Sequence, residues 1–226
     1  MTADDNRGRI RLLLDTADSK AWREWLPTGL FHGVTTNPTL LAAAGIPCAL
    51  PDLRRLADTA FALGTGELQM QTFGRSAEAL EANGRAIAAI DHRIVVKVPI
   101  TREGAIAAAR LKADGIRITM TAVYASHQAL SAAALGADYA APYLGRMNDA
   151  GRDGAGEIAA MQAMVRSAGS AMRILVASLR SAEDLARLAA LGLDTFTFSP
   201  KVAAALFADP LTTAAAEAFE VAAETP

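Results

Sequence analysis

Cysteine, surplus basic charge and long apolar runs are all scarce in this sequence. Cys48 is the one cysteine in 226 residues, so no disulfide can form within the chain, which favours a reducing compartment. Lysine and arginine total 22 against 24 acidic residues, and no basic stripe suggests a nucleic-acid partner. No segment approaches the roughly 20 apolar residues of a membrane span, and residues 10–14 are too short for a signal peptide. We therefore expect a cytoplasmic protein without nucleic-acid or membrane partners.

A glycine-rich phosphate loop is also missing. The first apolar run ends in Asp15-Thr16-Ala17-Asp18-Ser19, which contains no glycine, and Gly64-Thr65-Gly66 precedes a candidate strand instead of following one. This disfavours a nicotinamide-dependent oxidoreductase, whose dinucleotide fingerprint follows a strand. We expect neither a cofactor nor a metal, because no ligand spacing relates the three histidines His32, His92 and His127.

Short apolar, β-branched runs alternate with alanine-rich stretches along the whole chain. The runs predict eight strands, at residues 10–15, 33–37, 67–72, 94–100, 116–122, 137–143, 173–178 and 194–199. Apolar spacing between them predicts helices, among them 76–90, 102–112, 126–135, 157–167 and 181–191. Ser181 is placed to cap the last of these helices, and Gly115, Gly136 and Gly192 are placed to end three of them. Such alternation indicates parallel strands joined by right-handed crossovers.

Two α/β architectures accommodate eight such units, an open doubly wound sheet and a closed (β/α)₈ TIM barrel. The missing glycine loop and the short connections favour the barrel. No Pro, Ser or Gly linker divides the chain, so we expect a single domain over residues 1–226, with residues 1–9 mobile. An apolar face at residues 211–223 predicts an extra C-terminal helix, packed on the barrel or on a neighbouring chain.

Polar side chains collect at the carboxyl ends of the predicted strands, where TIM barrels carry their active sites. A barrel with a purely structural role would not need this ring of polar side chains. Its members are Asp15, Thr35, Thr36, Asn37, Gln69, Gln71, Lys97, Thr119, Thr121, Tyr143, Ser178 and Arg180.

Lys97 is the most informative of these residues because it lies inside the apolar run Ile94–Ile100. Side chains alternate along a strand. If Val96 and Val98 face the helices, Lys97 therefore points into the barrel. Burial there lowers the pKa of an amine, and a neutral amine can attack a ketone to form a Schiff base. The alternative is a salt-bridged lysine at a strand end.

The other candidates also have structural interpretations. Asp15 is placed equally well to cap a helix, and Tyr143 could be a core aromatic whose hydroxyl bonds to the backbone. Ser178 ends the seventh predicted strand and Arg180 follows it, in a region where TIM barrels often hold phosphate, and Arg146 could supply a second cation. Either arginine alone is more often a solvated surface residue.

Six segments that contain these residues resemble the small transaldolase and fructose-6-phosphate aldolase family. They occur in family order and span nearly the whole chain. The segments are Leu13-Leu14-Asp15-Thr16, Gly33-Val34-Thr35-Thr36-Asn37-Pro38, Val95-Val96-Lys97-Val98-Pro99, Thr121-Ala122-Val123-Tyr124, Ala141-Pro142-Tyr143 with Arg146, and Ala177-Ser178-Leu179-Arg180.

The resemblance implies a class I, metal-free enzyme of carbohydrate metabolism that acts on sugar and aldehyde substrates. Lys97 matches the family's Schiff-base lysine, and Asp15 matches its acidic residue at the substrate hydroxyls. The remaining roles carry over residue by residue: substrate positioning by Thr36 and Asn37, a catalytic water at Thr121, and phosphate binding by Arg146, Ser178 and Arg180. The family also implies a ring-like homo-oligomer, often of ten subunits, joined partly through the last helix.

Two positions separate the branches of this family. Members that act as transaldolases have a glutamate on strand three and a phenylalanine on strand six. This chain has Gln71 and Tyr143 at these positions and so resembles the members that act as aldolases. We therefore expect an aldolase acting on a fructose 6-phosphate-like ketose, with a transaldolase and an inactive sugar-phosphate-binding barrel as alternatives. Gln69 lies two residues before Gln71 and would face the same way, so it could take the same role. The segment Met147-Asn148-Asp149 departs from the acid-rich loop of the family.

Overall fold

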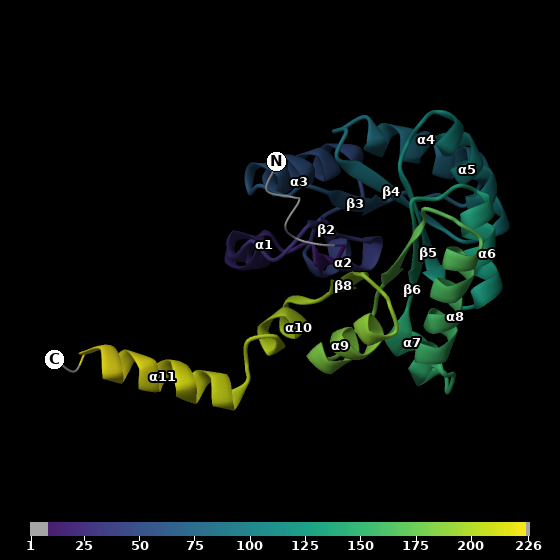
Figure 1. Ribbon diagram of the computed structural model, residues 1–226. Coiled ribbons are helices and arrows are strands. Elements are labelled where there is room, and N and C mark those ends of the chain that lie inside the picture. The colour runs from purple at the N-terminus through teal and green to yellow at the C-terminus, as the bar shows by residue number, and fades with distance from the viewer. Residues whose placement is uncertain (1–8, 225–226) are drawn as a thin grey trace.

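The computed structural model describes residues 9–224 and contains a closed barrel of parallel strands in sequential order, β1 to β8. This arrangement confirms the predicted (β/α)₈ fold (Figure 1). The eight predicted strands are all present, most of them shortened at their ends. They are β1 Arg11–Asp15, β2 Gly33–Thr35, β3 Leu68–Gln71, β4 Ile94–Pro99, β5 Ile118–Val123, β6 Tyr139–Pro142, β7 Arg173–Val176 and β8 Thr195–Phe198.

Helices form an outer layer around the barrel (Figure 1). The Ser181 side chain accepts a hydrogen bond from the Asp184 amide, which confirms the predicted N-cap. The three glycines predicted to end helices all have positive φ, between 70° and 86°, the left-handed conformation that glycine adopts without strain. The helices are α1 Ser19–Trp25, α2 Pro38–Ala43, α3 Leu50–Ala62, α4 Ala77–Ala88, α5 Arg102–Ala113, α6 Ser126–Ala134, α7 Leu144–Asp149, α8 Gly154–Ser167, α9 Ala182–Ala190, α10 Pro200–Ala205 and α11 Pro210–Glu224, with a short 3₁₀ turn η1 at Leu26–Thr28.

The two faces of each strand pack into different cores. Val96 and Val98 of β4 belong to the large core between the barrel and its helices. Val95 belongs to a small cluster inside the barrel, together with Leu13 and Tyr139. The inward-facing set on β4 is therefore Val95, Lys97 and Pro99, as the alternation predicts.

The predicted extra helix is α11, and it extends away from the barrel instead of lying on it (Figure 1). Its residues are all exposed, including Leu211 at 81% and Phe219 at 71%. The sequence left two packing partners open for this helix, its own barrel or a neighbouring chain. The structure shows that α11 does not pack on its own barrel. Most of the N-terminal segment expected to be mobile, residues 1–8, lies outside the described residues.

Candidate active site

A cavity of about 360 Å³ opens at the carboxyl ends of the strands. Ten residues were given a role in catalysis or substrate binding, and eight of them line this cavity: Asp15, Asn37, Gln71, Lys97, Thr121, Tyr143, Arg146 and Ser178. These groups come from strands β1 to β7 or, like Arg146 in α7, from the segments after them, so the barrel brings together residues that are far apart in the chain.

Lys97 is held at the bottom of this cavity by its position on β4. Its neighbours in register are Gln71 on β3 and Thr119 on β5. Only 4% of the residue is exposed, and its Nζ donates a hydrogen bond to the backbone oxygen of Thr36 at 2.9 Å. Burial lowers the pKa of the amine, while the negative charge of Asp15 acts in the opposite direction. The fold therefore favours the neutral, nucleophilic form of this lysine.

Asp15 lies at the end of β1 and is oriented by hydroxyl groups. Thr35 Oγ1 donates to Asp15 Oδ1 at 2.6 Å and also lies within hydrogen-bond distance of Thr197 Oγ1. A hydroxyl has one proton, so Thr197 donates to Thr35, which donates to the carboxylate. The helix-capping role considered for Asp15 belongs to Asp18, whose side chain accepts from the Lys20 amide.

Thr197 was not recognised from the sequence as a site residue. The alternation Thr195-Phe196-Thr197-Phe198 could have identified it. Two threonines alternate there with two large apolar residues in a strand, so the polar face must be the one that points into the barrel.

Tyr143 and Thr121 form a pair on the opposite wall of the cavity. Their hydroxyl oxygens are 2.9 Å apart. The Arg146 guanidinium lies 4.9 Å from the centre of the Tyr143 ring and donates to the Tyr124 hydroxyl at 3.3 Å. Tyr124 in turn packs edge-on against Tyr143, with 5.5 Å between ring centres. Tyr124, which the sequence did not single out, thus helps to fix both Arg146 and Tyr143.

The two candidate glutamines occupy different layers of the barrel. Gln69 is fully buried, donates to Glu67 Oε1 at 2.9 Å and accepts from the Thr119 hydroxyl at 2.8 Å. It does not line the cavity, whereas Gln71 does. Although both side chains face inward, only Gln71 is in reach of a ligand in the cavity.

Thr36 and Arg180 do not line the cavity. The Thr36 hydroxyl donates to the backbone oxygen of Gln69 at 3.2 Å, so this residue faces the site only through the carbonyl that accepts from Lys97. Arg180 is exposed and forms an ion pair with Asp149. Asn37 lines the cavity, and its Oδ1 also caps α2 by accepting from the Leu40 amide at 3.0 Å.

Backbone strain is concentrated at this end of the barrel. In the described part of the chain, Ala122 and Ser178 are the two residues other than glycine with positive φ, at 60° and 58°. Both line the cavity, and the β5–β6 register shifts between Met120 and Val123. Left-handed backbone costs about 1–2 kcal/mol for a residue with a Cβ, and strain of this kind clusters at functional sites.

Comparison with known proteins assigns the chain to a family. The sequence matches the model of the family described as Transaldolase/Fructose-6-phosphate aldolase over residues 12–225. The chain belongs to this family.

Curated members of the transaldolase/fructose-6-phosphate aldolase family align with nearly the whole chain. A protein from Caulobacter sp. (strain K31) named "Probable transaldolase" is 37% identical over 210 residues, which cover 93% of this chain and 94% of that protein. A protein of the same name from Thermus thermophilus is 37% identical over 211 residues, covering 90% of this chain and 93% of that protein. The recognition of the family from its motifs is thus confirmed.

A solved structure shows the same fold in a distant protein. Thiamine phosphate pyrophosphorylase from Pyrococcus furiosus superposes with a TM-score of 0.59 at 14% sequence identity, over 85% of this chain and 87% of that one. At this identity the similarity concerns the barrel alone.

Two features are absent from residues 9–224. No helix there is long and apolar enough to cross a membrane, and no three His, Cys, Asp or Glu side chains gather as a metal site would require.

Proposed function

We propose that this family member is a class I aldolase. Its substrate would be a ketose such as fructose 6-phosphate, split into a dihydroxyacetone-type donor and an aldehyde acceptor similar to glyceraldehyde 3-phosphate. The observation that carries the proposal is the buried amine of Lys97, with its lowered pKa, at the bottom of a polar cavity. Lysine is almost never fully buried without a partner or a purpose.

In the first step the neutral Lys97 amine attacks the ketone carbon of the sugar. The hydroxyl of the resulting carbinolamine takes up a proton, which we assign to Tyr143 acting through a water, and leaves as water to give an iminium ion. Asp15 lies close enough to act electrostatically on the Lys97 amine, and its negative charge would stabilise the cationic iminium as it forms. Its carboxylate, oriented by Thr35, would also accept hydrogen bonds from the substrate hydroxyls.

In the second step the carbon–carbon bond of the ketose breaks. A base removes the proton of the hydroxyl on the departing carbon, the aldehyde leaves, and the bonding electrons move to the iminium nitrogen to give an enamine. We assign this proton transfer to Tyr143, acting through a water held by Gln71 and Thr121. The 2.9 Å separation between the Tyr143 and Thr121 hydroxyls supports this assignment.

The third step decides between an aldolase and a transaldolase. An aldolase must protonate the enamine on carbon and hydrolyse the imine, which releases dihydroxyacetone and the free amine. A transaldolase must keep the enamine unprotonated until a second aldehyde arrives. At these two positions the chain has a phenol, Tyr143, which can donate a proton, and an amide, Gln71, in place of a carboxylate, which favours protonation.

The phosphate of the acceptor would bind at the outer rim of the cavity. Arg146 and Ser178 both line the cavity, and an arginine matches the geometry of a phosphate group. We assign Arg180 to the same phosphate, although it would first have to leave the Asp149 carboxylate.

Transaldolase activity is the second candidate, favoured by the names of the relatives. Fructose 6-phosphate supplied alone, and then together with erythrose 4-phosphate, separates the two activities. The aldolase proposal predicts free dihydroxyacetone without an acceptor. Transfer to erythrose 4-phosphate, with no release in its absence, would identify a transaldolase. Binding of the sugar phosphate with neither reaction would identify an inactive barrel.

A further inference from the structure

A second hollow lies at the opposite end of the barrel, around the amino ends of the strands. It consists of a cavity of about 380 Å³ and an adjoining one of about 220 Å³. Both cavities are lined by the segment Ser170–Arg173. The proposed reaction takes place at the carboxyl ends of the strands and uses no group from this end.

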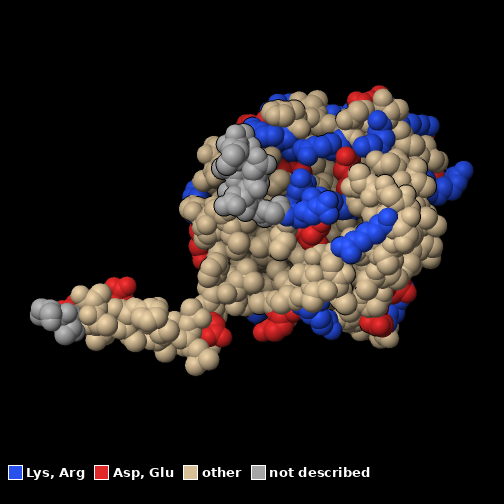
Figure 2. Space-filling view, in the orientation of Figure 1, with Lys and Arg blue, Asp and Glu red and all other residues tan. Residues whose placement is uncertain are grey.

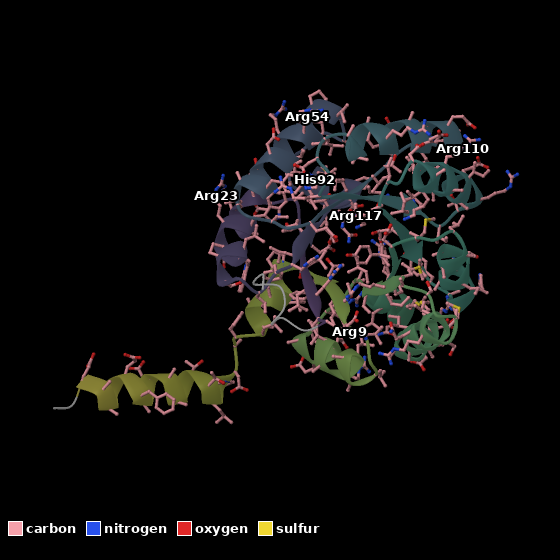
Figure 3. The ribbon with its side chains drawn as sticks, turned by 45° about the horizontal axis from the view of Figure 1, so that its top comes forward. Arg9, Arg23, Arg54, His92, Arg110 and Arg117 are labelled. Carbon is pink, nitrogen blue, oxygen red and sulfur yellow. The ribbon has the colours of Figure 1, made fainter. Side chains whose placement is uncertain are left out.

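Arginines surround this hollow. Arg11, Arg117 and Arg173 line the larger cavity, and Arg9, Arg166 and again Arg173 line the smaller one. Figure 3 shows Arg117 over the middle of the barrel and Arg9 at its rim. Lysine and arginine side chains also gather at the middle of this face in Figure 2. This concentration of cations contrasts with the formal net charge of −2 of the whole chain.

Each of the three nearby carboxylates is already paired with a cation, two of them with arginines of the hollow itself. Asp138 accepts from Lys112 Nζ at 2.9 Å and from the Ile118 amide at 2.7 Å. Asp194 accepts from Arg173 at 3.1 Å, and the buried Glu67 accepts from Arg117 at 2.9 Å. Their negative charges therefore do not compensate the remaining arginines.

Three arginines have no carboxylate partner within the described residues: Arg9, Arg11 and Arg166. Arg11 donates to the Tyr139 hydroxyl at 2.7 Å. Burial, followed by the charge of Glu67, raises the pKa of Tyr139 to about 12, so this partner is an uncharged phenol at neutral pH. Arg166 donates to the backbone oxygen of Gly192, which is also uncharged. The hollow thus carries positive charge that the described protein groups leave unbalanced.

We propose that this hollow binds a small phosphorylated anion. Guanidinium groups bind phosphate oxygens through paired, charge-assisted hydrogen bonds. Arginines line both cavities, and Arg173 lies between them, so an anion with two linked phosphates could contact both groups at once. Its position at the far end of the barrel allows occupation together with substrate.

Inorganic pyrophosphate is a suitable probe, with binding to the full-length protein measured by isothermal titration calorimetry at low salt. Ala171 is exposed and lines both cavities, so Ala171→Asp adds a negative charge without removing an arginine contact. The matched control Ala171→Asn adds a side chain of the same shape without charge. We expect Ala171→Asp to raise the dissociation constant at least tenfold (about 1.4 kcal/mol) and Ala171→Asn to change it less than about twofold.

Two further variants locate the bound anion. Arg11→Met should weaken binding, while Arg54→Met, an exposed arginine on α3, should not. Arg146→Ala removes a cation from the carboxyl-end cavity and should leave pyrophosphate bound at the amino end. The proposal is overturned if the wild-type protein does not bind pyrophosphate, if Ala171→Asp and Ala171→Asn behave alike, or if Arg146→Ala alone abolishes binding.

Discussion

At the residue scale, the chemistry depends on polar side chains that a barrel interior would otherwise exclude. Lys97, Asp15 and Gln71 are inward-facing members of their strands, and protein groups fix the positions of the first two. The carbonyl of Thr36 holds the amine, and the Thr197–Thr35 pair holds the carboxylate. The cost of burying these groups is offset where hydrogen bonds are complete.

Replacement of Tyr143 by phenylalanine tests the proton-transfer role proposed for its hydroxyl. The change keeps the ring that packs against Arg146 and Tyr124 and removes the group paired with Thr121. Because general acid–base steps contribute about 10²–10⁴-fold in rate, we expect cleavage of fructose 6-phosphate to fall by roughly that factor, with transfer to erythrose 4-phosphate retained. Steady-state assays of both reactions measure the effect. Unchanged cleavage would remove Tyr143 from the mechanism.

The buried amine should also be visible in the pH dependence of stability. Folding lowers the pKa of Lys97 below its ordinary value of 10.5. At pH values between the pKa of the folded state and that of the unfolded state, the unfolded chain therefore binds more protons. The free energy of unfolding should therefore rise with pH in this window, by up to about 1.4 kcal/mol per pH unit from this group, and the gain is lost again as the pH falls. Denaturant unfolding of wild type and Lys97→Met at pH 7, 8 and 9 measures the difference. Identical pH profiles would mean that Lys97 titrates normally.

At the element scale, each strand end is positioned by the turn and helix that follow it. The turn after β4 is an example: a Cβ on Gly104 in α5 would lie 1.9 Å from the backbone oxygen of Pro99. Pro99 lines the cavity two residues after Lys97. The absence of a side chain at position 104 therefore allows α5 to begin directly under the strand that carries the lysine.

Gly104→Ala should displace the end of β4. We expect a loss of about 1–3 kcal/mol in unfolding free energy, typical of overpacking, and a lower kcat per folded molecule. The control is Ala109→Gly at an exposed position of the same helix, which should cost about 1 kcal/mol through helix propensity alone and leave kcat unchanged. Chemical denaturation and kinetics on both variants give the two quantities. A kcat of Gly104→Ala equal to that of the wild type would show that the close approach at Gly104 does not position the lysine.

The sequence was sufficient to predict the elements that have a clear period. Alternation in Ile94–Ile100 predicted that Lys97 points inward, and apolar runs separated by capped helices predicted the barrel. The same alternation could not separate Gln69 from Gln71, because both face inward and differ only in depth. The six-residue helices α2, α7 and α10 are too short to show a period, and none of them is among the predicted helices.

Contacts between distant segments account for the remaining differences. The ion pair of Arg180 with Asp149 and the hydrogen bond of Arg146 to Tyr124 depend on how α7 meets the segments that follow β7 and β5. The positive φ of Ala122 and Ser178 is imposed by the surrounding barrel, since neither residue favours it intrinsically. Local sequence patterns contain no signal for any of these features.

At the scale of the whole molecule, three features with different roles lie in different places, two at opposite ends of the barrel and one outside it. The carboxyl-end cavity carries the proposed chemistry, the amino-end hollow carries the unbalanced arginines, and α11 extends beyond the barrel (Figure 1). Exposed Leu211 and Phe219 on α11 are the kind of apolar surface that a monomer in water rarely keeps uncovered. We propose that a second copy of this chain covers α11 in a homo-oligomer.

Removal of residues 210–226 tests this proposed contact. We expect the shortened chain to keep the barrel, because no residue of α11 is buried, but to form a smaller assembly. Sedimentation velocity gives the mass, and circular dichroism reports the fold. Phe219→Glu should act in the same direction as the truncation, whereas Glu220→Gln should have no effect. An unchanged sedimentation coefficient for the truncated chain, apart from its lower mass, would contradict the role of α11.

The most direct test of the account is to trap the imine. Borohydride reduction in the presence of dihydroxyacetone converts a Schiff base into a stable three-carbon adduct, which peptide mass mapping can locate. Lys97 is one of four lysines in the chain, with Lys20, Lys112 and Lys201, so the position of the adduct is unambiguous. We predict an adduct on the peptide that contains Lys97 and none in Lys97→Met. A protein that remains unmodified, or that carries the adduct on another lysine, would contradict the proposed chemistry.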